Sequence, residues 1–258
     1  MGGCGRRPVP VRALSAWHDR SVDVNAPELT ARRIRDAQPG DVVEFGRYPH
    51  QVEGTDRTPI SWQVLERAGD ELFLVSARIL DCRRYYDEAT ETTWRDSAMR
   101  QWLNGAFLSQ AFSEAEQGII TPNRCDDNGN GTPDTVDRVF LLSVQEVRAL
   151  THPGQGHGLD RRAVATPFAI QKKSDGCHLY VYDKTVEKDH VVVDGDRRGC
   201  SWWWTRTQPQ AQNGTASRAA FIGARGDVKS YGRVDIPHYG VRPAIKLDAS
   251  SRHAPTES

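Results

Sequence analysis

The chain has 258 residues, a length that suits one large domain or one domain with extensions. Lys and Arg together number 34, and so do Asp and Glu, so the overall charge predicts neither a nucleic-acid partner nor an anionic membrane surface. Because no run of about 18 apolar residues exists, we expect no membrane-spanning helix.

Residues 1–38 mix Arg, Pro, Ala and Asp with little periodicity, and we expect them to form an N-terminal extension. They lack the apolar core of about 7–15 residues that a signal peptide requires. The compartment stays open: cytoplasmic if this N-terminus is native, extracellular if an export signal was removed. Stronger patterns follow, so we place the main domain at 39–250 and a disordered tail at 251–258.

Alternating and apolar runs predict strands at the start of the main domain, at 41–48, 60–67 and 71–80. The short turn between the last two predicts a hairpin. Apolar residues at helical spacing then predict a helix that begins after Asp96 or Ser97 and stops at Asn104 and the glycine that follows.

A second short helix is expected to open at Ser113, because Glu116 completes a capping box. The same pattern recurs at Ser143 and Glu146, after a predicted strand at 138–143. Strands outnumber helices in the prediction, so the fold class is α+β. Beyond a long loop at 151–162, further strands are expected at 179–183, 190–195, 200–207, 217–228 and 241–247.

Seven separated strings resemble one family of bacterial domains, the domain-of-unknown-function family 6273. The resemblance itself implies no activity. By analogy it implies a C-type-lectin-like fold, shared with formylglycine-generating enzymes, with mixed, mostly antiparallel sheets and two or three short central helices. The strings, in order from about Asp41 to Asp248, are GDVVEFGRYPHQ, PISWQVLE, LFLVSARILD, TTWRDSAMRQWLNGAFLSQAFSEAE, DRVFLLSVQEV, WWWTR and GVRPAIKLD.

The chain departs from the family pattern at two places. His50 stands between Pro49 and Gln51, where the family usually runs Tyr-Pro-Gln. Near the end, Thr205 replaces the leucine of Trp-Trp-Leu-Arg-Ser-Pro, and the proline is delayed to Pro209. These changes put a ligand specificity shared with the family in doubt.

The stretch DDNGNGTPDTVD has the spacing of a twelve-residue calcium loop, with Gly131 at the sharp turn. We expect such an ion to be structural, and Ca²⁺ is the cofactor that the sequence suggests. The alternative is a hydrated polar turn. The predicted ligands are Asp126, Asn128, Asn130, the Thr132 carbonyl, Asp134 and Asp137.

The strand CSWWWTRT is the second candidate site. Alternation places Trp202 and Trp204 on one face with Arg206, and Trp203 on the other. Aromatic faces stack on sugars or planar rings, and a nearby arginine anchors carboxylate or phosphate. The alternative is that the tryptophans are core and Arg242 is structural. The predicted ligand-binding residues are Trp203, Trp204, Arg206 and Arg242.

The five cysteines are scattered without a CxxC pair, which argues against a zinc site and a dense disulfide framework. We expect free buried thiols, with one bridge between Cys177 and Cys200 left open. No histidine pair has zinc-ligand spacing, and no nucleophile or phosphate-loop motif is present.

The leading hypothesis is a non-enzymatic domain that binds a small molecule, a glycan or a protein and is stabilised by calcium. Its surface would lie around the 151–162 loop, the WWWTR strand and the 207–218 loop. One alternative is an oxidase of the formylglycine-generating type, or another metal-dependent enzyme on this scaffold, in which Cys177 and Cys200 take part. Another alternative is a structural module of a surface assembly. The oligomeric state stays open.

Overall fold

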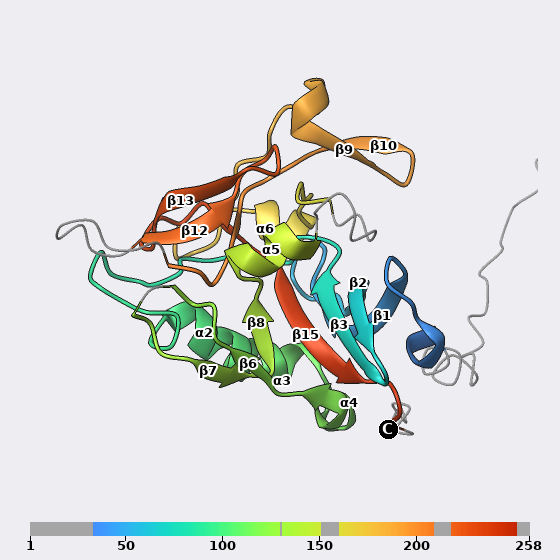
Figure 1. The fold of residues 1–258 in the computed structure, drawn as a ribbon. Helices are drawn as coiled ribbons and strands as arrows, with labels where there is room; N and C mark the ends of the chain where they lie inside the picture. The colour runs from blue at the N-terminus through green and yellow to red at the C-terminus, as the bar shows by residue number, and fades with distance from the viewer. Residues whose placement is uncertain (1–32, 130, 151–159, 209–217, 252–258) are drawn as a thin grey trace, which may run out of the picture.

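The computed structural model describes residues 33–129, 131–150, 160–208 and 218–251. A six-stranded sheet forms one half of the molecule, at the right of Figure 1. The C-terminal strand β15 lies inside this sheet, because it pairs with β3 on one side and with β5 and β8 on the other. All neighbours are antiparallel, and the strands are β1 (Val42–Tyr48), β2 (Thr58–Ala68), β3 (Glu71–Ser76), β15 (Pro243–Asp248), β5 (Ile120–Thr121) and β8 (Val139–Leu141).

The predicted hairpin is confirmed as β2 and β3, with Val64 opposite Leu74. Side chains of β2 alternate between buried and partly exposed positions, and Trp62 and Val64 point into the core. An alternating strand buries one face and leaves the other to solvent. A slip of one residue would expose the apolar side chains, so burial of this face specifies how β2 pairs with β3.

A five-stranded sheet forms the other half, at the left of Figure 1. The pairing of β11 with β14 is parallel, and the other pairings are antiparallel. Gly240 allows that close approach, since a Cβ there would lie 3.0 Å from the Trp202 carbonyl oxygen. The strands, in spatial order, are β13 (Val228–Arg233), β12 (Arg218–Ile222), β11 (Trp203–Trp204), β14 (Gly240–Val241) and β4 (Asp81–Cys82).

Two small antiparallel hairpins complete the strands. The hairpin of β9 (His190–Val193) and β10 (Asp196–Gly199) projects away from the larger sheets in Figure 1. The other joins β6 (Asn123–Cys125) to β7 (Thr135–Asp137) and encloses the predicted calcium loop. Mostly antiparallel sheets with few helices make the fold α+β, as the sequence predicted.

The first predicted helix starts where expected but does not stop at Asn104. Ser97 caps its start by accepting a hydrogen bond from the Arg100 amide. The chain then continues without a break through α2 (Ala98–Trp102), a π-helical turn η1 (Leu103–Phe107) and α3 (Leu108–Ala111). Asn104 turns its side chain to the neighbouring strand instead of ending the helix, and the continuation buries Phe107.

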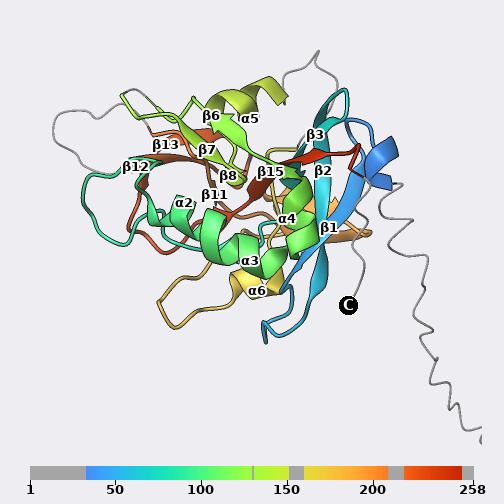
Figure 2. The same cartoon turned by 90° about the horizontal axis from the view of Figure 1, so that it is seen from below.

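The remaining helices are short, and Figure 2 shows α2 and α3 in one row that leads to α4. Both predicted capping boxes are present, at Ser113 with Glu116 and at Ser143 with Glu146. These helices are α4 (Glu114–Ile119), α5 (Val144–Leu150), α6 (Pro167–Ile170) and the 3₁₀ turn η2 (Glu187–Asp189). No helix in the described part of the chain is long and apolar enough to cross a membrane.

The strand predicted at 179–183 is wrong. The Tyr182 amide donates to the Cys200 carbonyl oxygen, but the segment joins no strand of the described sheets. Tyr180 and Val181 are exposed despite being apolar. The local apolar pattern favoured a strand, but a strand also requires a ladder of hydrogen bonds to a neighbouring strand, and this segment forms none.

One core joins the two large sheets and the helices. It includes Ile34 and Ala37, and Arg67 donates hydrogen bonds to the carbonyl oxygens of Arg35 and Ala37. The last residues of the predicted extension 1–38 therefore pack on the main domain. Residues 1–32 and the predicted tail beyond Ser251 lie outside the described residues, as do most of the two predicted recognition loops.

Candidate functional site

The tryptophans of the WWWTR strand lie in the core. Trp203 and Trp204 are fully buried, and their indole nitrogens donate to the Arg161 and Arg83 carbonyl oxygens at 2.9 and 3.0 Å. Trp202 and Trp204 both pack on Tyr239, which fits the predicted alternation. With no face open to solvent, Trp203 and Trp204 fit the core alternative and not a stacking platform.

Arg206 is buried as well, at 1% exposure, and forms a bidentate ion pair with Glu146 of α5. Its Nε donates to the Asn128 side-chain oxygen, and Nη1, which also bonds Glu146, donates to the Leu141 carbonyl oxygen. Burial opposes the charge, but the hydrogen bonds and charge of Glu146 leave the pKa of Arg206 above its ordinary value. The guanidinium thus ties α5, β8 and the acidic loop together.

Arg242 stacks on Trp203, with its guanidinium carbon 5.3 Å from the ring centroid. Its Nε donates to the Ser76 carbonyl oxygen at 2.8 Å. Burial lowers the pKa of Arg242 to about 10, although the charge of Asp160 acts in the opposite direction. This position suits the structural alternative: the cation is held by an aromatic face and by carbonyl oxygens of the chain.

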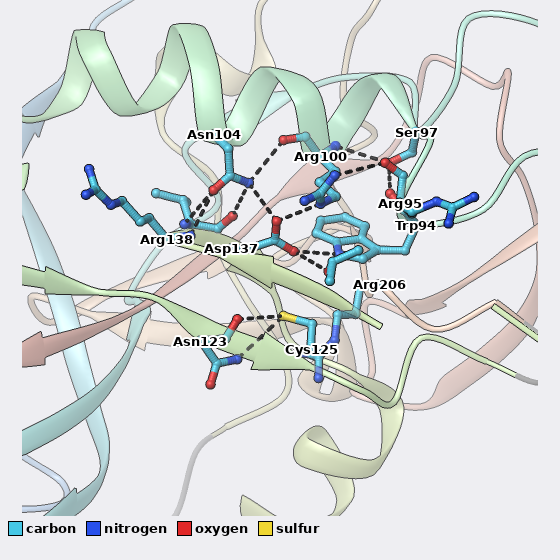
Figure 3. A network of polar contacts seen from close by, with 12 residues as sticks. Trp94, Arg95, Ser97, Arg100, Asn104, Asn123, Cys125, Asp137, Arg138 and Arg206 are labelled. Carbon is cyan, nitrogen blue, oxygen red and sulfur yellow. Dashed lines mark hydrogen bonds and ion pairs between the residues drawn. The ribbon is translucent and has the colours of Figure 1, made fainter. Parts of the chain in front are cut away.

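Asp137, the last residue of the predicted calcium loop, is the centre of a buried network (Figure 3). Its carboxylate accepts hydrogen bonds from Trp94 Nε1 at 3.0 Å, Thr135 Oγ1 at 2.6 Å and Arg100 Nε at 2.6 Å. Asn104 lies beside them and bonds both the helix and β8. The carboxylate therefore joins β7 to the helix that contains Arg100.

Three of the other predicted calcium ligands also have protein partners. Asp134 forms an exposed ion pair with Arg124, and the Asn128 oxygen accepts from Arg206. The Asn128 amide nitrogen donates to the Cys125 and Pro133 carbonyl oxygens. Asp126 is exposed, Thr132 bonds the Gly129 carbonyl, and Asn130 lies outside the described residues. These contacts favour the polar-turn alternative, and the calcium site stays a prediction.

A second buried carboxylate, Asp81, lies at the end of the five-stranded sheet and is 1% exposed. Tyr48 Oη donates to its Oδ2 at 2.8 Å, and the Cys82 amide donates to its Oδ1 at 2.7 Å. Lys173 forms an ion pair with Oδ1, and Arg83 Nε lies 3.5 Å from Oδ2. One carboxylate thus faces two cations and a phenol that come from three separate segments.

Each of the two cations also lies over an aromatic ring. The Arg83 guanidinium carbon is 4.1 Å from the Trp102 centroid, and Lys173 Nζ is 4.4 Å from that of Phe168. Both cations are partly exposed, with side-chain exposures of 38% and 17%. The terminal nitrogens of Arg83 donate to no residue in the described ranges. We call Tyr48, Asp81, Arg83, Trp102, Phe168 and Lys173 the Asp81 cluster.

Burial perturbs the titration of this cluster. It raises the pKa of Tyr48 to about 12, against the charge of Arg83. It lowers the pKa of Lys173 to about 8, although the negative charge of Asp175 acts in the opposite direction. Perturbed groups that gather around partly exposed side chains mark candidate functional sites, so the Asp81 cluster is the candidate site of this domain.

Two cysteines lie directly beside the cluster. Cys82 follows Asp81, and its thiol and that of Cys177 shift each other's pKa, upward for Cys82 and downward for Cys177. The bridge left open between Cys177 and Cys200 is not formed, because Cys200 packs in a separate small apolar cluster with Val164. The expected free buried thiols are confirmed for the four described cysteines. Among the described residues, no group of three or more His, Cys, Asp or Glu side chains is placed to hold a metal ion.

His50, the residue that departs from the family pattern, lies near the end of β1. Its titration makes the stability of the folded chain depend on pH. Burial lowers its pKa, against the charge of Asp56, and its Nε2 has no hydrogen-bond partner. In the unfolded chain the pKa of a histidine is about 6.5. As the pH falls, His50 therefore takes up a proton in the unfolded chain before it does so in the folded chain. The contribution of neutral His50 to the free energy of unfolding is fully present above about pH 6.5. It is lost as the pH falls from there towards the pKa of His50 in the folded chain.

We therefore expect His50→Gln to flatten the pH dependence of stability between about pH 7 and pH 5. The main-chain bonds of His50 to Asp56 and Phe168 do not need the imidazole, so the fold should persist. Urea unfolding of both proteins across this range measures the effect. A constant difference between wild type and variant at every pH would contradict it.

No motif in the sequence predicts the Asp81 cluster. The available signal was DCRR, three charged residues and a cysteine directly after the apolar run that ends at Leu80. A carboxylate at the end of a buried strand needs partners, but the sequence does not say which ones. Tyr48 and Lys173 are distant in the chain, and only the fold brings them together.

The fold and the site define a single-core α+β domain with two buried, arginine-linked polar networks and a partly exposed cationic cluster. The chain belongs to the domain of unknown function family DUF6273, whose model matches residues 69–249. The resembling strings in β1 and β2 precede the matched region. No curated protein and no solved structure matches the chain.

Proposed function

We propose that this chain is a non-enzymatic binding domain that recognises an anionic group on a small-molecule or glycan ligand at the Asp81 cluster. The observation that carries the proposal is Arg83, whose guanidinium is held on Trp102 while its terminal nitrogens have no partner in the described residues. This surface takes the place of the WWWTR strand in the hypothesis, because Trp203 and Trp204 are buried.

The charges of the cluster favour an anion. Lys173 contacts the Asp81 carboxylate directly and balances its charge. Arg83 lies farther from the same carboxylate, at 3.5 Å, so its positive charge is left largely uncompensated at the surface. A guanidinium held by an aromatic ring loses little freedom on binding and can donate two parallel hydrogen bonds to a carboxylate or a phosphate.

The aromatic rings suit the remainder of such a ligand. Trp102 and Phe168 are both partly exposed beside the two cations. Exposed aromatic faces pack on the apolar faces of sugar rings and on planar groups. A C-type-lectin-like fold, proposed from the family resemblance, agrees with the mostly antiparallel sheets and short helices.

The proposal is tested with three probes that share one ring: glucuronate, glucose 6-phosphate and glucose. We expect the two anions, but not neutral glucose, to shift the indole NMR signal of Trp102. We expect Arg83→Gln to weaken anion binding at least about tenfold, since a hydrogen bond to a charged group contributes about 1.5–3 kcal/mol.

Arg148→Gln is the matched control, because Arg148 is an exposed arginine on α5. It should leave the affinity unchanged. Equal binding of the anions by wild type and Arg83→Gln would refute the proposed site. A response to glucuronate alone or to the phosphate alone would tell which anion the site prefers.

A further inference from the structure

Cys82 and the residue that follows Cys177 contact the same carbonyl group beside the candidate site. Cys82 Sγ lies 3.5 Å from the Pro237 carbonyl oxygen. The amide of His178, the residue after Cys177, donates to that oxygen at 2.9 Å. Cys82 belongs to β4 and Cys177 to the segment after α6, so the shared carbonyl fixes two distant segments next to each other.

The surroundings of the pair make the two sulfurs unequal. Arg84 Nη1 lies 3.6 Å from Cys177 Sγ, and the Cys177 amide is held by Asp175. The hydrogen bond from Cys82 lowers the pKa of Cys177, and the same bond together with burial raises the pKa of Cys82. Cys177 is therefore the sulfur that becomes a thiolate first, and the thiolate is the reactive form.

We propose that Cys82 and Cys177 form a disulfide when the chain folds in the presence of a low-molecular-weight disulfide such as oxidised glutathione, which reaches the two sulfurs before folding buries them. The Cys177 thiolate attacks one sulfur of the reagent and forms a mixed disulfide, releasing one glutathione thiolate. Cys82 then attacks the Cys177 sulfur and releases the second glutathione thiolate. The two protein thiols are oxidised, the reagent is reduced to two glutathione thiols, and the protons of Cys82 and Cys177 pass to these products.

The other two described cysteines supply internal controls. Burial raises the pKa of Cys125 to about 12 and that of Cys200 to about 11, against the charges of Arg206 and Arg162. Cys125 contacts the Asn123 side chain, and Cys200 lies among Val164 and Ala224. Neither thiol has a second cysteine beside it among the described residues, so both are expected to remain reduced.

The experiment starts from the full chain with Cys4→Ser, because Cys4 lies outside the described residues. The reduced, denatured protein is refolded in a glutathione redox buffer, free thiols are alkylated, and the disulfide-linked peptides are mapped by mass spectrometry. We expect one linked pair, Cys82 with Cys177, a mass loss of about 2 Da for this two-electron oxidation, and alkylated Cys125 and Cys200.

Two variants sharpen the result. Cys82→Ser should leave Cys177 as a persistent mixed disulfide with glutathione, since the resolving sulfur is missing. Cys125→Ser should change nothing in the linked pair. A correctly folded protein with all four thiols alkylated, or a scrambled set of pairs that includes Cys125 or Cys200, would overturn the proposal. The ligand probes described above are not needed for this measurement, so its outcome is independent of the proposed function.

Discussion

Replacing Arg206 by alanine is expected to lower the free energy of unfolding by about 3–5 kcal/mol, because it removes one partner of a buried ion pair. The change leaves the Glu146 carboxylate and the Asn128 oxygen without their shared donor, and the Leu141 carbonyl loses its bond as well. For a domain of this size we expect Tm to fall by about 10 °C, at about 2–4 °C per kcal/mol. Calorimetry and urea unfolding measure the effect.

A double-mutant cycle separates the ion pair from the packing around it. With Glu146→Gln as the second substitution, the Arg206→Ala penalty should shrink, since no buried charge is then left unpaired. Arg206→Lys keeps the charge but not the planar fork, and it should fall between wild type and alanine. Arg233→Gln, in an exposed pair with Asp235, is the control and should change little. Equal effects of Arg206→Ala and Arg233→Gln would contradict this account of the network.

Asp137→Ala is expected to be as damaging, at about 3–5 kcal/mol, because it removes a fully buried carboxylate that pairs with the partly buried Arg100 and accepts two further hydrogen bonds. Trp94, Thr135 and Arg100 then lose the acceptor that joins β7 to the helix (Figure 3). Thermal unfolding in EDTA measures the loss. Asp134→Ala is the matched control, because that carboxylate pairs only at the surface with Arg124, and it should leave Tm nearly unchanged.

The same pair of variants tests the predicted calcium loop. If the loop binds calcium, millimolar calcium raises the Tm of the wild type, and Asp134→Ala loses that rise, because a ligand that binds only the native state stabilises it. If Asp137 acts only through its protein partners, calcium changes neither protein. Asp137→Ala would then still lower Tm in EDTA, with no effect of calcium on either protein. If Asp137→Ala left Tm in EDTA unchanged, the proposed network around Asp137 would be refuted.

Much of the local structure could be predicted because local rules govern it. The β2–β3 hairpin follows from alternation and a short turn, and the caps at Ser97 and Ser113 follow from side chains that satisfy free amides. The same reasoning failed at Asn104, where a distant strand satisfies the side chain and the helix continues. It failed again at 179–183, where a strand-like pattern forms no ladder with a neighbouring strand.

The candidate site was beyond such rules. Asp126–Asp137 has the spacing of calcium ligands, but the sequence does not show that Asp137 Oδ2 faces Trp94 and Oδ1 faces Arg100. Likewise WWWTR is compatible with a ligand platform and with a core strand in the sequence, and the surrounding strands bury it. Burial of a whole strand depends on its neighbours in the sheet.

The sequence by itself determined the fold class, most of the strands, the helix starts and the family, since these depend on periodicity, capping and the order of local strings. Only the tertiary structure decided which polar groups meet. Tyr48, Asp81 and Lys173 come together, as do Cys82 and Cys177, because the chain returns late to place β15 and β14 inside the two sheets. Contacts between residues so far apart in the chain depend on the order of the strands in the sheets and not on a local sequence pattern. The strands take this order because it buries their apolar side chains in one shared core.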